Sequence, residues 1–240
     1  MKSEGLPLSA QVAVVTGASR GIGLAIAHCL GRLGARVAIC GRDSARLSSA
    51  EKSLSEAGID VLAIRSDVSR EAEVSEMFRQ ITERLGEVEI LVNNAGVGVF
   101  GPAHETSVAD WDRVMDTNLK GAFLCSRAVA PAMIARGRGH IINISSLAGK
   151  NAFAGGGVYC ASKWGLQGLT GCLAEDLRGH GIRVSVICPG SVDTEFSPHT
   201  GKSPEKMLRP DDVAHAVEML VTQAPNSFIS EILLRPTRKP

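Results

Sequence analysis

Short apolar runs alternate along this chain with longer segments in which apolar residues recur at helical spacing. Most of the short runs are unbroken rather than alternating, which is typical of strands buried on both faces. The predicted strands are 12–15, 36–40, 61–64, 89–92, 140–144, 183–187 and 228–234. The predicted helices are 21–33, 44–57, 71–85, 106–136, 158–179 and 210–222.

The regular alternation of strands and helices decides how the sheet is built. Right-handed crossovers between successive strands predict a three-layer α/β protein with a doubly wound, parallel, seven-stranded sheet, the Rossmann fold. No linker divides the pattern, so we expect one domain over residues 1–240, with 1–10 as an N-terminal extension. Ligands of such sheets bind where the strands end, so the residues just after each strand are the functional candidates.

Composition removes several classes of function. With 26 basic and 25 acidic residues and a net charge of +1, the chain lacks the electrostatic footprint of a nucleic-acid-binding protein. No apolar run approaches the length of a transmembrane helix, and the start of the chain does not read as a signal peptide. Six cysteines without CxxC and six histidines without HExxH predict reduced thiols and no metal site. We therefore expect a cytoplasmic protein that binds neither nucleic acid nor membrane.

A glycine-rich turn, Thr16-Gly-Ala-Ser-Arg-Gly-Ile-Gly23, joins the first predicted strand to the first predicted helix. Its glycines let backbone N–H groups approach a pyrophosphate, and the helix N-terminus favours negative charge. A turn that only connects a strand to a helix is the alternative, but the position after the first strand favours a dinucleotide site. The residues predicted to bind the cofactor here are Gly17, Ser19, Arg20, Gly21, Ile22 and Gly23.

The end of the second predicted strand indicates which dinucleotide is bound. An acidic residue there would bind the ribose 2′-hydroxyl of NAD, but this chain has Gly41 at that position, followed by Arg42. Two guanidiniums, from Arg42 and Arg20, can clamp a phosphate dianion. Asp43 is a competing signal, although its place before Ser44 is typical of a helix N-cap. The sequence thus favours NADP(H) over NAD(H).

The only tyrosine of the chain, Tyr159, lies four residues before Lys163. On a helix this spacing puts the phenol and the ammonium on one face. A nearby positive charge favours phenolate and lowers the pKa of a phenol, which makes proton transfer feasible near neutral pH. From these two residues alone, a packing tyrosine beside a solvated lysine remains the plainer interpretation.

Taken together, the motifs resemble those of the short-chain dehydrogenase/reductase family over nearly the whole chain. The matching elements, in family order, are the TGxxxGxG turn, Asn93-Asn94-Ala95-Gly96, Asn118, Ser146, Tyr159-xxx-Lys163 and Pro189-Gly190-Ser-Val192-Asp-Thr194. Ser146 stands thirteen residues before Tyr159, as the family pattern requires.

The resemblance implies four catalytic residues. Tyr159 would exchange a proton with the substrate oxygen, and Lys163 would lower the pKa of Tyr159 and bind the nicotinamide ribose. Ser146 would stabilise developing negative charge on that oxygen. Asn118 would hold a water that connects Lys163 to solvent. The neighbouring Ser145 is expected to support the structure, because adjacent side chains on a strand point to opposite faces.

The resemblance also implies the rest of the cofactor cleft. Asp67 and Val68 would contact the adenine, although Asp67 is equally placed to cap the next helix. Val192 and Thr194 would hold the carboxamide. The remaining residues expected to line the cleft are Asn94, Ala95, Gly96, Tyr159, Lys163, Pro189 and Gly190.

The substrate is less sharply defined. The resemblance implies a carbonyl–alcohol interconversion by hydride transfer, on a 3-oxoacyl thioester or a small carbonyl compound. Arg136 and Arg138 fit docking of an acyl carrier protein, but His180 stands where such reductases usually have a second docking arginine. The alternatives are a 3-hydroxy acid (serine-type) dehydrogenase and a non-catalytic NADP(H)-sensing regulator. The presence of all four catalytic candidates favours an enzyme.

Two further expectations concern the surface. Residues 195–208 contain prolines and a glycine and are expected to form a substrate lid, in which His199 is a candidate contact. The family commonly forms homo-oligomers, so we expect a tetramer or a dimer.

Overall fold

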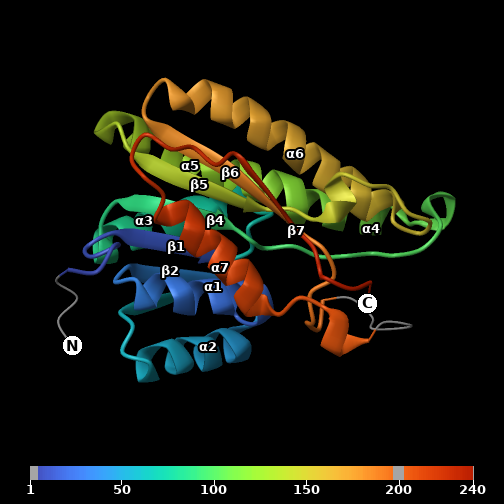
Figure 1. Cartoon of the computed structure of the whole chain (residues 1–240), viewed down its shortest axis with the longest axis horizontal. Coiled ribbons are helices and arrows are strands. Elements are labelled where there is room, and N and C mark those ends of the chain that lie inside the picture. The colour runs from blue at the N-terminus through green and yellow to red at the C-terminus, as the bar shows by residue number, and fades with distance from the viewer. Residues whose placement is uncertain (1–4, 197–202, 240) are drawn as a thin grey trace.

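The computed structural model describes residues 5–196 and 203–239. Within them, seven strands form one parallel sheet in the order β3-β2-β1-β4-β5-β6-β7 (Figure 1). The strands are β1 (Val12–Thr16), β2 (Arg36–Gly41), β3 (Val61–Arg65), β4 (Val88–Asn93), β5 (Gly139–Ile144), β6 (Ile182–Pro189) and β7 (Glu231–Leu234). The predicted doubly wound Rossmann fold is confirmed.

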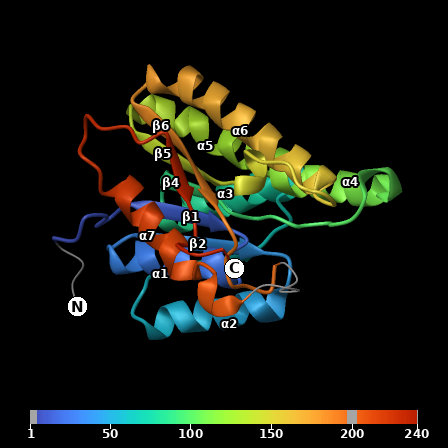
Figure 2. The ribbon, with the colours of Figure 1, turned by 45° about the vertical axis from the view of Figure 1, so that its right-hand side comes forward.

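Helices cover both faces of the sheet (Figures 1 and 2). One face carries α1 (Gly21–Arg32), α2 (Ser44–Glu56) and α7 (Pro210–Val221). The other carries α3 (Glu71–Leu85), α5 (Gly121–Arg136) and α6 (Gly157–Arg178). Among the described residues, no helix combines the length and hydropathy needed to cross a bilayer.

Strands β1 to β6 each contribute to two separate cores. In β1, Ala13 and Val15 pack with the α1, α2 and α7 side, whereas Val12 and Val14 pack with the α3, α5 and α6 side. Because both faces are buried, most positions of such a strand are apolar. This double burial is the physical reason for the unbroken apolar runs.

The strand order places a crevice beside β1. The chain moves outward from β1 to β2 and β3, and then returns to pair β4 with the other side of β1. Crossovers on the two sides of this switch point therefore cover opposite faces, and the connections that leave β1 and β4 diverge. In open α/β sheets this divergence creates the ligand-binding crevice.

The prediction of one continuous helix over residues 106–136 is wrong. The structure divides it into α4 (Val108–Met115), a π-helical turn, η2 (Asp116–Lys120), and α5. Wide turns of this kind interrupt α-helices mostly at functional sites. Here the turn contains Asn118, whose side chain bonds to groups outside the helix.

The last predicted strand and the predicted lid also differ in extent from the expectation. The predicted strand 228–234 pairs with β6 only over Glu231–Leu234. Of the predicted lid 195–208, residues 197–202, including His199, lie outside the described residues. The described part contains a short 3₁₀ turn, η4 (Pro204–Lys206). Leu208 closes this part against the sheet through a bridge with Val192.

Candidate active site

A cavity of about 580 Å³ opens at the carboxyl ends of β1, β2 and β4, beside the switch point. Most of the predicted cofactor-binding residues line it: Gly17, Ser19, Arg20, Gly21, Ile22, Gly23, Arg42, Asp67, Val68, Asn94, Ala95, Gly96, Tyr159, Lys163 and Thr194. The cavity wall does not include the predicted cofactor-binding residues Pro189, Gly190 and Val192, or the predicted catalytic residues Asn118 and Ser146. The fold thus gathers segments from most of the chain around one cavity.

The residues at the end of β6 lie next to this cavity and are held by β7 and the lid segment. Pro189 pairs with Leu234, and the N–H of Gly190 donates to the carbonyl of Leu234 at 2.8 Å. Val192 forms a β-bridge with Leu208, and this bridge fixes the backbone two residues before Thr194. Thr194 reaches the cavity, where its methyl group would lie 3.4 Å from a Cβ placed on Gly21.

The floor of the cavity needs glycine at two positions. Gly17 has a φ of +63°, and a Cβ there would lie 2.7 Å from the Cα of Ala95. A Cβ on Gly23 would lie 2.5 Å from the carbonyl oxygen of Gly17. The predicted turn therefore brings backbone, rather than side chains, to the surface that a pyrophosphate would contact.

Thr16, which the sequence reasoning did not single out, fastens this turn to the loop after β4. Its Oγ1 accepts hydrogen bonds from the N–H groups of Asn94 and Ala95, both at 3.0 Å. Asn94 returns two bonds through Nδ2, to the carbonyls of Thr16 and Gly17. The two loops that border the switch point are thus held as one unit.

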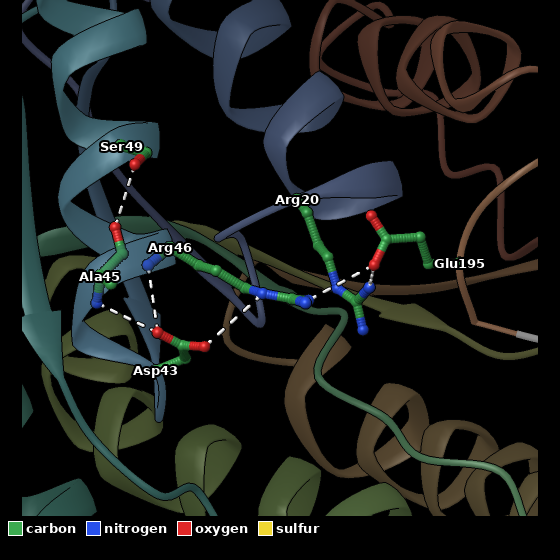
Figure 3. A network of polar contacts seen from close by, with 6 residues as sticks. All are labelled: Arg20, Asp43, Ala45, Arg46, Ser49 and Glu195. Atoms are coloured by element: carbon green, nitrogen blue, oxygen red, sulfur yellow. Dashed lines mark hydrogen bonds and ion pairs between the residues drawn. The ribbon is translucent and has the colours of Figure 1, made fainter.

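Asp43 has the role expected from the sequence. Its carboxylate accepts from the N–H groups of Ala45 and Arg46, at 3.0 and 3.1 Å, and so caps α2 (Figure 3). The Asp43 carboxylate is therefore engaged by the helix, although Asp43 lines the cavity together with Arg42.

Asp67 also lines the cavity and is not the N-cap of α3, because Arg70 holds that position. Its carboxylate instead accepts from the N–H and the hydroxyl of Ser69, at 3.0 and 2.7 Å, and lies 3.8 Å from Arg42. Burial acts to raise the pKa of Asp67, but the Ser69 hydrogen bonds and the Arg42 charge outweigh it and lower the pKa. The alternative of a helix cap is wrong, and the expected adenine contact stays a prediction.

Tyr159 and Lys163 lie on the buried side of α6, as their spacing predicts. The Lys163 Nζ donates to the carbonyl of Ile144 at 2.9 Å and lies 5.8 Å from the centroid of the Tyr159 ring. Burial lowers the pKa of Lys163 to about 8 and raises the pKa of Tyr159 to about 12, while a hydrogen bond with Ser146 lowers the latter. The direction for Tyr159 is opposite to the expected one, because desolvation disfavours the phenolate. At neutral pH the phenol is therefore a proton donor.

The two serines after β5 differ in what they contact. Ser146 caps a short 3₁₀ turn, η3 (Leu147–Gly149), with its Oγ accepting from the N–H of Ala148 at 3.1 Å, and it faces Tyr159. Ser145 donates to the carbonyl of Lys163 at 3.4 Å and accepts from Gln167 at 3.0 Å. As expected, Ser145 ties β5 to α6, which leaves Ser146 as the hydroxyl beside the phenol.

Asn118 connects three segments at the back of the site. Its Nδ2 donates to the carbonyl of Val97 at 2.9 Å and to the Ser162 hydroxyl at 3.0 Å, and its Oδ1 accepts from the Val97 N–H at 2.8 Å. Gly96 lies between Asn118 and Lys163, since a Cβ there would be 3.4 Å from the amide oxygen and 3.8 Å from Nζ. The structure shows a positioning role, and the water relay stays a prediction.

Three phenylalanines near Tyr159 were missed by the sequence reasoning. Phe100 and Phe196 place their ring centroids 5.4 and 5.7 Å from that of Tyr159, and Phe153 lies 6.4 Å from Phe100. Each is 40–50% exposed. They follow β4, β5 and β6, so their place just after predicted strands was the available signal. Tyr159 is consequently flanked by aromatic rings.

Known proteins resemble the chain over most of its length. A family model described as short chain dehydrogenase matches residues 11–205. The chain belongs to the short-chain dehydrogenase family. An uncharacterized oxidoreductase of Staphylococcus saprophyticus in this group is 36% identical, and the match covers 95% of this chain and 98% of that protein. The glycine betaine reductase ATRR of Emericella nidulans is 38% identical across 98% of this chain, but the chain spans only 19% of its length.

Solved structures extend the comparison. A metagenomic short-chain oxidoreductase in complex with NADP is 49% identical, with a TM-score of 0.86 over 97% of this chain and 100% of that one. The actinorhodin polyketide ketoreductase with NADPH is 34% identical, with a TM-score of 0.87 over 94% of this chain and 95% of that one. The chain is thus an oxidoreductase of the short-chain dehydrogenase family.

Proposed function

We propose that the protein is an NADP(H)-dependent oxidoreductase that interconverts a carbonyl and an alcohol by hydride transfer, with Tyr159 as the acid/base. The observation that carries this proposal is that Tyr159 and Lys163 line the same cavity as the Gly17–Gly23 turn. The complexes of the related proteins with NADP and NADPH support the choice of cofactor.

The residues present fit such a cofactor. The backbone of the Gly17 turn forms a cradle that a Cβ on Gly23 would fill. Arg20 and Arg42 border the same cavity where a ribose 2′-phosphate would lie. At the end of β2, where an acidic residue would bind a free 2′-hydroxyl, the chain has Gly41. When bound, the nicotinamide supplies or accepts the hydride.

The chain's own groups supply the proton and the placement. With its pKa raised to about 12, the Tyr159 phenol is protonated at neutral pH and can donate to the substrate oxygen. The Ser146 hydroxyl next to it donates a second hydrogen bond to that oxygen. The Lys163 ammonium, 5.8 Å from the ring, stabilises the phenolate that remains. This set of protonation states suits carbonyl reduction at neutral pH.

Among the substrates considered, a small carbonyl compound is favoured over an acyl-carrier thioester. The basic residues expected to dock a carrier are engaged within the chain. Arg136 bonds to Glu87 at 3.0 Å and to the carbonyl of Val88 at 2.6 Å, and Arg138 bonds to Glu89 at 2.8 Å. Releasing them for a partner would break these contacts.

A second candidate substrate is a small aldehyde that carries a quaternary ammonium group. The aromatic faces of Phe100, Phe153 and Phe196 beside Tyr159 are the kind of surface that binds such cations. A glycine betaine reductase among the relatives, whose named substrate carries this group, supports the idea.

A substrate panel with NADPH tests the proposal. It contains betaine aldehyde, its neutral isostere tert-butylacetaldehyde, aromatic ketones and an acetoacetyl thioester, with 3-hydroxy acids and NADP⁺ in the reverse direction. We expect turnover of small carbonyl compounds that Tyr159→Phe abolishes. A preference for the charged aldehyde over its isostere selects the second candidate. Activity only on 3-hydroxy acids or only on the thioester contradicts the preference for a small carbonyl substrate. Activity on none of them contradicts the proposed reaction and favours a cofactor-sensing regulator.

The proposal includes assembly into a homo-oligomer, either a tetramer or a dimer. Trp111, Phe123 and Trp164 on α4, α5 and α6 are 44%, 42% and 51% exposed. These side chains lie on helices that contact one another, and a second copy packed there would cover them. Light scattering coupled to size exclusion measures the mass directly, and a monomer would contradict this part of the proposal.

A further inference from the structure

Three segments converge on one carboxylate at the rim of the cofactor cavity (Figure 3). Arg20 comes from the glycine-rich turn, Arg46 from the first turn of α2, and Glu195 from the segment after β6. Arg20 forms a hydrogen-bonded ion pair with the Oε2 of Glu195, and the Nη1 of Arg46 lies 3.5 Å from the same oxygen. Arg46 also lies 3.5 Å from Asp43, which holds it toward the cavity.

The arrangement has the chemistry of an anion site. Two guanidiniums point at one oxygen next to the end of β2, where Arg42 also lines the cavity wall. A guanidinium presents several N–H donors in a plane and binds phosphate oxygens as readily as carboxylate oxygens. The single carboxylate of Glu195 uses only part of this donor capacity.

Glu195 is also easy to displace. Its side chain is 69% exposed, and those of Arg20 and Arg46 are 46% and 49% exposed. Ion pairs this open to solvent contribute little to stability. A phosphate monoester carries almost twice the charge of a carboxylate and three acceptor oxygens, so it competes well for the same guanidiniums.

We infer that Arg46 is a third guanidinium of the site for a ribose 2′-phosphate, and that the Glu195 carboxylate fills this site until a 2′-phosphate displaces it. The inference rests on the proposed use of NADP(H) and goes beyond it in assigning these two residues. It makes Arg46 a determinant of cofactor specificity and Glu195 an internal competitor that weakens binding of 2′-phosphorylated nucleotides. A nucleotide without the 2′-phosphate leaves the ion pairs intact.

Calorimetric titration with two nucleotides separates these roles without turnover. The probes are adenosine 2′,5′-bisphosphate and adenosine 5′-monophosphate, which differ only in the 2′-phosphate. The variants are Arg46→Gln and Glu195→Gln. Their matched controls are Lys52→Gln, which removes a positive charge further along α2, and Glu205→Gln, which removes an exposed carboxylate in η4.

We expect Arg46→Gln to weaken the bisphosphate about ten-fold and to leave the monophosphate within about two-fold. Glu195→Gln is expected to tighten the bisphosphate by about three-fold, in keeping with an exposed ion pair. The gain in bisphosphate affinity from Glu195→Gln should be smaller in a double variant that also carries Arg46→Gln, since the two residues share one site. Both control variants should behave like the unsubstituted protein.

Two results would overturn the inference in different ways. In the first, the unsubstituted protein binds the bisphosphate more tightly than the monophosphate, but Arg46→Gln changes the binding of neither probe or weakens the binding of both equally. The same conclusion follows if Glu195→Gln weakens binding of the bisphosphate. In these cases the assignment of Arg46 and Glu195 fails while NADP(H) use stands. If the unsubstituted protein binds both probes equally, the proposed cofactor preference fails and the assignment fails with it.

Discussion

The ammonium nitrogen of Lys163 lies 5.8 Å from the ring centroid of Tyr159 and is held there by the carbonyl of Ile144, 2.9 Å away. Both side chains are buried, and burial favours the neutral form of each group. It lowers the pKa of Lys163 to about 8 and raises the pKa of Tyr159 to about 12. At neutral pH the lysine is still mostly charged and the phenol is protonated. The pair is therefore set to donate a proton and to stabilise the anion that results.

The high pKa of Tyr159 predicts a silent phenol in the free protein. Because Tyr159 is the only tyrosine, its ultraviolet absorbance reports this one residue. We expect no phenolate signal between about pH 6 and about pH 10, since an ordinary phenol titrates near ~10 and burial raises this pKa to about 12. Subtracting a parallel titration of Tyr159→Phe removes the thiolate contribution. A phenolate transition near pH 8 would show that Lys163 outweighs burial.

Removing Arg42 should reduce cofactor discrimination. Arg42→Ala is expected to lower the ratio of kcat/KM for NADPH to that for NADH by roughly ten-fold or more, because one charge-assisted contact to the 2′-phosphate is lost. The value for NADH should stay nearly constant. Arg32→Ala, an exposed position in the last turn of α1, is the matched control. An unchanged ratio in Arg42→Ala would argue against a 2′-phosphate at this end of the cavity.

His140 should make the protein sensitive to acid. It lies buried in β5 with Nε2 2.9 Å from the Ser185 hydroxyl, and burial lowers its pKa from 6.5 to about 3. Between these values the unfolded chain binds a proton that the folded chain does not. The contribution of His140 to the free energy of unfolding is therefore largest above about pH 6.5 and falls on acidification, by up to about 1.4 kcal/mol per pH unit.

Urea unfolding of His140→Gln measures this contribution. The slope of unfolding free energy against pH between about pH 6 and about pH 4 should become shallower than in the unsubstituted protein. His104→Gln, whose side chain is 82% exposed, should leave the slope unchanged. An identical slope in His140→Gln would mean that the histidine is protonated in the folded protein.

Asn118 should matter for both stability and turnover. Asn118→Ala removes the side-chain partner of both Val97 backbone groups and the hydrogen bond that the Ser162 hydroxyl accepts. Each such loss costs roughly 1–3 kcal/mol, so a clear fall in the urea midpoint and in kcat is expected. Asn151→Ala removes an exposed amide bonded to Leu147 and should change neither. Unchanged stability in Asn118→Ala would contradict the positioning role.

Much of the fold was predictable because burial on both sheet faces leaves a direct trace in the sequence. The apolar runs of β1 and β2 are continuous for that reason, and Gly17 and Gly23 mark places where a side chain does not fit. Sequence spacing also predicted that Tyr159 and Lys163 share a helix face. These features depend on local periodicity or on a single backbone requirement.

Features that depend on distant contacts were not predictable in the same way. Arg46 stands on an ordinary exposed helix turn, and only the fold brings Glu195 to it across 149 residues of chain. Asn118 in the π-helical turn bonds to Val97 and Ser162, which are distant in the sequence, and helix periodicity alone reveals neither the turn nor these bonds. The pKa of Tyr159 was expected to fall, because spacing shows a neighbouring charge but not the depth of burial.

The central claim is that Tyr159 transfers the proton while other groups hold the cofactor. The most direct measurement is kcat of Tyr159→Phe on a reducible carbonyl substrate, with NADPH affinity measured in parallel by fluorescence. The account predicts a fall in kcat of order 10³ or more, with the dissociation constant of NADPH within about two-fold of the unsubstituted protein. Turnover within about ten-fold of normal in Tyr159→Phe would contradict it.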